Sequence, residues 1–124
     1  MKAKAVAYWI CTVLTALAFL SGGVAYVMRA PQVVEGITHL GYPIHFLVFL
    51  GVCKILGAVT ILVPRFPRLK EWAYAGLIFD LIGASVAHAA SGDEMRHIVT
   101  PVVIGAVIIA SWALRPESRK LKAA

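Results

Sequence analysis

The chain has 124 residues, about the size of one domain, yet 60% of it is hydrophobic and its mean hydropathy is +0.84. A water-soluble domain has too little interior to bury that much apolar surface, which excludes an ordinary soluble protein. The net charge of +6 does not indicate a nucleic-acid partner, because the basic residues lie at the ends of apolar runs and form no single stripe.

Four apolar runs are long enough to cross a hydrocarbon core of roughly 30 Å, which takes about 20 helical residues. They cover residues 5–28, 44–63, 72–90 and 98–114. The first run follows two lysines, as a secretion signal would, but it is too long for a typical signal and we predict a retained helix. The sequence therefore predicts an all-α integral membrane four-helix bundle, with residues 1–124 forming a single domain.

The distribution of basic residues predicts how the bundle is oriented. Nine lie in the two tails and the second connection, against two in the other connections. Because cytoplasmic loops carry the excess of Lys and Arg, both termini are predicted to lie in the cytoplasm. Trp9, Trp72 and Trp112 fall near the same predicted interface, where an indole keeps its N–H hydrated. The nine residues are Lys2, Lys4, Arg65, Arg68, Lys70, Arg115, Arg119, Lys120 and Lys122, and the two are Arg29 and Arg96.

Two connections carry structural signals of their own. After Pro31, apolar residues recur at helical spacing over residues 31–40, which predicts a short amphipathic helix on the outer surface. The turn at residues 64–68 contains two prolines and is short, so the second and third runs are predicted to form an antiparallel hairpin. The tail from residue 115 to 124 is predicted to be a frayed, basic helix end at anionic headgroups.

Lys54 and Asp80 lie near the middle of the second and third runs. A charge at the bilayer centre costs about 2.5–3.5 kcal/mol on insertion scales, so both residues require an explanation. Residues of an antiparallel hairpin lie at equal depth when they are equally far from its turn, and Lys54 and Asp80 are equally far from Pro67. The sequence therefore predicts that the two side chains are level and paired.

Small residues surround both charges on the same helix faces. Such stripes let helices approach closely, so both charges are predicted to point into the bundle. The third run contributes Gly76, Gly83, Ala84 and Ala87, and the second contributes Gly51, Gly57 and Ala58.

Two interpretations of the charged pair stay open. In one, the pair fixes the register and orientation of the helices and does no chemistry; breaking it would then be costly even if it adds little stability. In the other, the pair lines a small polar cavity that binds a ligand or relays a proton.

The four histidines are all predicted at the outer side of the membrane. His45 opens the second run and His88 ends the third at almost the same distance from the turn, while His39 and His97 lie in the outer connections. We therefore add His45 and His88 to Lys54 and Asp80 as candidate ligand-binding residues. Imidazoles could ligate haem or a metal, or exchange protons with a quinone, but interfacial histidines are more often solvated anchors, so no metal site is assigned.

The sequence carries no recognisable catalytic motif. Cys11 and Cys53 lie in different runs and form no Cys-x-x-Cys pair, so they are interpreted as small buried side chains without a disulfide. No nucleotide-binding loop, zinc-protease motif or nucleophile elbow is present. The catalytic residues are unknown, and the sequence leaves open whether the protein is an enzyme.

Three segments resemble the DoxX-like family of small bacterial membrane proteins with four transmembrane helices. They are residues 40–43 (LGYP), 50–57 (LGVCKILG) and 64–83 (PRFPRLKEWAYAGLIFDLIG), and the resemblance extends from Tyr8 to Arg119. It implies a multi-pass protein of the bacterial cytoplasmic (inner) membrane. The family's membrane Lys and Asp map onto Lys54 and Asp80, and its His maps onto His88, without an established catalytic role.

The resemblance also suggests a redox function, because DoxX-type proteins are named after a subunit of a thiosulfate:quinone oxidoreductase. The first hypothesis is a membrane partner in quinone-linked or thiol-stress redox chemistry that binds a small lipophilic ligand near the Lys54–Asp80 pair, with quinone as the candidate cofactor. The alternative is a non-enzymatic assembly, stress-response or solute-binding module whose charged pair is structural. A channel is disfavoured because one four-helix chain encloses too little space, although a homo-oligomer could form one.

Overall fold

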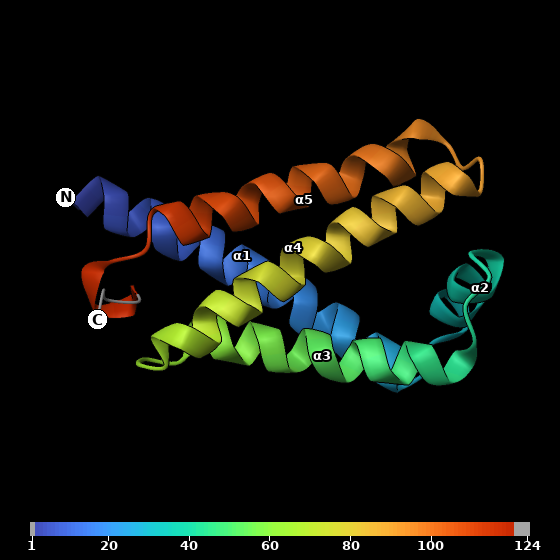
Figure 1. Cartoon of the computed structure of the whole chain (residues 1–124), viewed down its shortest axis with the longest axis horizontal. Coiled ribbons are helices and arrows are strands. Elements are labelled where there is room, and N and C mark those ends of the chain that lie inside the picture. Colours follow the sequence, from blue (N-terminus) through green and yellow to red (C-terminus); the bar gives the residue numbers. More distant parts are fainter. Residues whose placement is uncertain (1, 121–124) are drawn as a thin grey trace.

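The computed structural model describes residues 2–120, and within them all regular structure is helical (Figure 1). The elements in chain order are α1 (Lys2–Val27), α2 (Pro31–His39), α3 (Ile44–Leu62), α4 (Pro67–Ala90), α5 (Met95–Ala113) and the short 3₁₀ helix η1 (Glu117–Arg119). Four of these helices, α1, α3, α4 and α5, are long and apolar enough to cross a membrane. The all-α prediction with four such helices is confirmed.

Helix α4 begins five residues before the third apolar run. Its first turn is mostly polar, so hydropathy alone did not include it in the run. Pro67 occupies the start of the helix, where its fixed φ suits helical geometry and its missing N–H costs nothing. Helix α2 likewise has Pro31 in its first turn, and it buries Ile37. The predicted amphipathic segment is therefore a helix.

The long helices are arranged as two pairs, α1 with α3 and α4 with α5, which spread apart along the molecule (Figure 1). The beginning of α1, the end of α5 and the α3–α4 turn lie at one end of the bundle, which we call the terminal end. Helix α2 and the α4–α5 connection lie at the opposite end, which we call the distal end.

Helices α1 and α3 approach most closely at Gly23 and Gly51. A Cβ atom added at Gly23 would lie 2.9 Å from the carbonyl oxygen of Gly51, and one added at Gly51 would lie 2.8 Å from that of Gly23. Real Cβ atoms do not come this close to backbone, so the crossing requires glycine at both positions.

The core lies where the two pairs meet, nearer the terminal end. Leu77 and Ile108 pack there against Ala58 and Ile61 of α3, all nearly inaccessible. A buried polar cluster adds to this contact: Ser111 of α5 hydrogen-bonds Thr12 of α1 at 2.6 Å and Tyr74 of α4 at 2.8 Å. Many large apolar side chains instead face outward, as lipid contact requires.

The cationic side chains of Lys70 and Arg119 cap the last turn of α3. Lys70, whose exposure is only 2%, donates to the carbonyl oxygens of Thr60 (2.7 Å) and Val63. Arg119 donates to the carbonyl oxygens of Ile61, Leu62 and Val63 at 3.1–3.2 Å. These are the carbonyls that a helix end leaves without partners.

The segment around Arg119 therefore folds back onto the bundle. The Arg119 guanidinium also lies 4.8 Å from the centre of the Trp9 ring on α1. The prediction of a frayed helix end is wrong for residues 115–120, while Lys122 and the rest of that tail lie outside the described residues.

Candidate functional site

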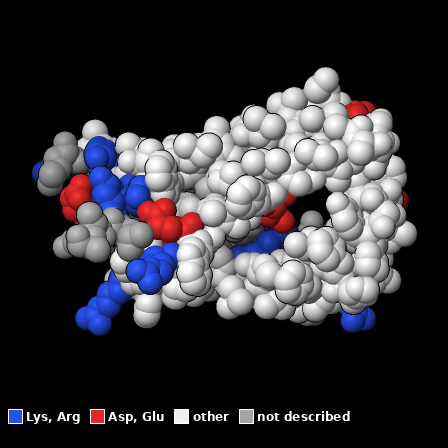
Figure 2. Space-filling model, in the orientation of Figure 1, with Lys and Arg blue, Asp and Glu red and all other residues white. Residues whose placement is uncertain are grey.

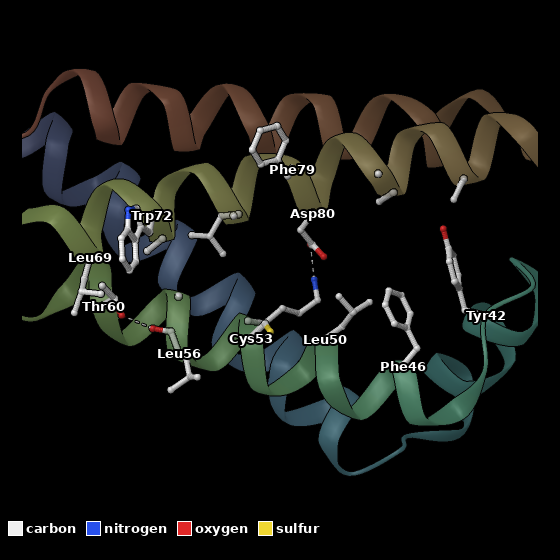
Figure 3. Close-up of a pocket in the computed structure, with 18 of the residues that line it drawn as sticks. Tyr42, Phe46, Leu50, Cys53, Leu56, Thr60, Leu69, Trp72, Phe79 and Asp80 are labelled. Carbon is white, nitrogen blue, oxygen red and sulfur yellow. Dashed lines mark hydrogen bonds and ion pairs between the residues drawn. The ribbon is translucent and has the colours of Figure 1, made fainter.

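A cleft opens between α3 and α4, where the two helices diverge from their shared turn. Its volume is about 790 Å³, which falls within the range of small-molecule sites, about 300–1,000 Å³. Figure 2 shows the hollow between the helix pairs, with blue and red atoms meeting inside it between walls that are white. The lining is mostly apolar, and its aromatic members, labelled in Figure 3, are Tyr42, Phe46, Trp72 and Phe79.

The small-residue stripe of α4 forms one wall of this cleft. A Cβ atom added at Gly76 or Gly83 would meet nothing within 4 Å, so the stripe faces open space. The expected close approach of helices at small residues is therefore absent at Gly76 and Gly83. The cleft exists because the close approach of α3 is to α1, at Gly51, which leaves α4 free to diverge. The stripe residues in the lining are Gly76, Gly83, Ala84 and Ala87.

The charged pair spans the cleft from one helix to the other. Lys54 on α3 donates a hydrogen bond from Nζ to Oδ2 of Asp80 on α4 across 2.8 Å (Figure 3). The two side chains keep 14% and 20% of their exposure, and both belong to the cleft lining. The predicted pairing is present, but the charges meet in an open cleft and not in a closed helix contact.

Two aromatic rings of α1, neither of them among the predicted site residues, complete the surroundings of Lys54. Its Nζ lies 4.8 Å from the ring centre of Phe19 and 5.0 Å from that of Tyr26. The electron-rich faces of aromatic rings attract cations. The seven-residue spacing of Phe19 and Tyr26 puts both on one face of α1. This spacing is the signal in the sequence that groups the two rings. It does not show which helix that face of α1 contacts.

Cys53 also lines the cleft, next to Lys54 in the chain. Its side chain is exposed and Cys11 is half-buried, and both cysteines are free. The interpretation of both as buried is wrong for Cys53, because its side of α3 borders the opening.

Three histidines gather at the distal end around Asp93, a residue that was not among the predicted site residues. His88 Nδ1 donates to one carboxylate oxygen at 2.6 Å and His39 Nε2 to the other at 2.7 Å. The ring of His97 stacks on that of His88 with centres 5.3 Å apart. Hydrogen bonds from His88 and then His39 hold the pKa of Asp93 below its usual value. Through His39, this carboxylate joins α2 to the α4–α5 connection at the distal end of the bundle.

The four predicted ligand-binding residues do not form one site. Lys54 and Asp80 lie together in the cleft, whereas His88 bonds to Asp93 and His45 is exposed in the first turn of α3; neither histidine lines the cleft. Equal depth does not bring these two histidines together, because α3 and α4 are far apart by the distal end. Within residues 2–120, no three His, Cys, Asp or Glu side chains are grouped so that they could hold a metal ion.

Four apolar helices and a cleft that contains a charged pair define a small multi-pass membrane protein. Residues 10–111 match the DoxX-like family, and the chain belongs to this family. The resemblance of the three segments quoted above is thereby confirmed, and the protein is an integral membrane protein.

A curated relative is an uncharacterized protein, YdgD, of Bacillus subtilis (strain 168). It is 34% identical to this chain over 74 residues, which cover 60% of this chain and 64% of that protein. The matched segment thus spans less than two thirds of the relative. No solved structure matches the chain significantly.

Proposed function

We propose that the protein takes up a small lipophilic molecule from the bilayer into the α3–α4 cleft and serves as a membrane partner in quinone-linked or thiol-stress redox chemistry. The observation that carries the proposal is a charged pair at the centre of a largely apolar cleft of about 790 Å³. Small-molecule sites combine apolar walls with a few convergent polar groups in this way. The proposed location is the bacterial cytoplasmic membrane, with both termini in the cytoplasm.

The charges in the cleft stand open to the bilayer, which is costly for the folded protein. A charge pair exposed to acyl chains is expensive, and helix packing alone would be served better by closing the space around it. Small residues along α4 keep the space open instead. A ligand with an apolar body and a polar group would fill the walls and contact the pair at once.

Binding can be tested by filling the cleft. A Cβ atom added at Gly83 would meet nothing within 4 Å, and Gly83 lines the cleft, so Gly83→Leu should fold and lose binding. Gly22→Leu is the matched control, because Gly22 also has free space around it but lies on α1, outside the cleft lining. The assay is saturable binding of ubiquinone and menaquinone, each in the oxidised and reduced form, to protein in nanodiscs. The absence of saturable binding of every form, or equal binding by both variants, would reject the proposal.

A structural role for the charged pair is the second candidate, and one observation favours it. Lys54 contacts Asp80 on α4 and two aromatic rings on α1, so it links three helices. Under this alternative, the double change Lys54→Met/Asp80→Leu should preserve cellular function, because an apolar pair can replace a structural ion pair. A double variant that folds but loses function would reject it.

A further inference from the structure

The geometry around Lys54 shows which of its hydrogen-bonding groups a ligand could reach. An ammonium group has three N–H donors and no acceptor. One donor is taken by Oδ2 of Asp80 at 2.8 Å, and two other sides of the group face the rings of Phe19 and Tyr26. The cation is thus directed toward Asp80 and α1, and it offers little to a molecule that enters from the cleft.

Asp80 presents the opposite situation. An ionised carboxylate only accepts hydrogen bonds, and it has two oxygens to do so. Among residues 2–120, the hydrogen bond from Lys54 to Oδ2 is the one this carboxylate receives, and Oδ1 is not fully buried. Asp80 is also the more exposed member of the pair and lines the cleft. Oδ1 is therefore an acceptor that a ligand could reach.

The charge balance of the cleft limits the class of ligand that it could bind. Lys54 already neutralises Asp80, so a ligand in the cleft needs neither a positive nor a negative charge. Of the other polar groups on the wall, the hydroxyl of Thr60 donates to the carbonyl oxygen of Leu56 within its own helix. The hydroxyl of Tyr42, the thiol of Cys53 and the indole N–H of Trp72 also belong to the lining, but they are uncharged and offer no acceptor as strong as a carboxylate. The aromatic side chains of Phe46, Trp72 and Phe79 supply surfaces on which a ring can pack.

From this geometry we infer that the cleft selects uncharged aromatic lipophiles that donate a hydrogen bond, such as phenols and hydroquinones, over molecules of the same shape that only accept. The donor meets Oδ1 of Asp80, where a carbonyl or ether oxygen would instead face an anionic oxygen. This inference rests on the proposed function. It adds that a reduced hydroquinone binds more tightly than its oxidised quinone.

The test uses two probes that differ in a single donor, para-nonylphenol and its methyl ether. Equilibrium dialysis between protein-containing and empty nanodiscs corrects for partition into lipid. A hydrogen bond to a charged acceptor predicts that the phenol binds roughly tenfold or more tightly. The double variant Lys54→Met/Asp80→Leu, which removes both charges together, should bind phenol and ether alike. Glu94→Gln, a carboxylate-to-amide change on the exposed α4–α5 connection, is the control that should keep the preference.

The outcomes separate this inference from the proposed function. Equal binding of phenol and ether by the unmodified protein overturns the donor preference and leaves ligand binding in the cleft standing. A preference that persists in the double variant also overturns the inference, because the selecting group would then lie elsewhere. The lack of saturable binding of either probe overturns both.

Discussion

Lys54 is a cation whose surroundings compensate its charge from both neighbouring helices. Its ammonium group lies in a membrane-spanning helix, and it is compensated by one carboxylate at 2.8 Å and two aromatic rings within about 5 Å. Removing Asp80 would leave the cation with the rings alone, and removing Lys54 would leave an uncompensated carboxylate. The two residues therefore act as a unit, and their contributions to stability are not separable.

The single changes Lys54→Met and Asp80→Leu should each lower the free energy of unfolding by up to about 3–5 kcal/mol, because each leaves one buried charge unpaired. The double change should recover most of this loss, which makes the two effects strongly non-additive. Unfolding in mixed micelles, followed by circular dichroism, measures all three values. Additive losses would show that the two charges do not interact.

At the scale of the element, α3 is held in place by three different kinds of interaction. Gly51 allows the close crossing with α1, Lys54 bonds to α4, and Lys70 with Arg119 caps the carbonyls at its end. Lys70 and Arg119 were expected to be basic residues at the membrane surface. Their capping role could not be predicted, because the return of residues 115–120 to the bundle depends on long-range contacts with α1 and α3.

Lys70→Met should destabilise the protein by about 2 kcal/mol or more, since it removes charged hydrogen bonds to carbonyls that are otherwise left unpaired. Arg68→Met is the matched control, because Arg68 is exposed in the same turn of α4. Unfolding of the two variants in micelles compares them directly. Equal losses would mean that the hydrogen bonds from Lys70 to these carbonyls add nothing to stability.

The bond between α2 and Asp93 should depend on pH. The pKa of Asp93 is lowered in the folded protein by the hydrogen bonds from His88 and His39. A lowered pKa means that the tether is present above the ordinary value of about 3.8 and is lost as the pH falls through the lower, folded value. A spin label at the exposed residue Gln32 of α2 should therefore gain mobility only in this acidic range. In Asp93→Asn it should be mobile already at neutral pH, and a label equally immobile in both proteins would contradict the tether.

At the scale of the whole molecule, the separation of two helix pairs creates the functional geometry. Four spans, their hairpin register and the Lys54–Asp80 pair followed from hydropathy and from distances to the turn. The cleft did not follow, because a stripe such as Gly76 and Gly83 is equally compatible with tight packing and with open space. Only the crossing of α1 and α3 at Gly23 and Gly51 decides between the two, and a single sequence does not show which glycines meet.

Orientation in the membrane is a prediction for the whole molecule. Lys and Arg gather at the terminal end, as Figure 2 shows, so this end is expected in the cytoplasm. In a background with Cys11→Ala and Cys53→Ala, Glu94→Cys at the distal end should react with an impermeant maleimide in intact spheroplasts. Glu117→Cys, which is at the terminal end and 86% exposed, should react only after permeabilisation. The reverse pattern would invert the topology.

The contact between Lys54 and Asp80 can be measured directly in a bilayer by solid-state NMR, through dipolar recoupling between ¹⁵N at lysine Nζ and ¹³C at aspartate Cγ. The chain has two aspartates, Asp80 and Asp93, and Asp93 bonds to histidines, so a lysine–aspartate signal reports this pair. We predict a coupling that corresponds to direct hydrogen bonding and disappears in Asp80→Asn. The absence of any lysine–aspartate coupling in the unmodified protein would contradict a charged pair in the cleft.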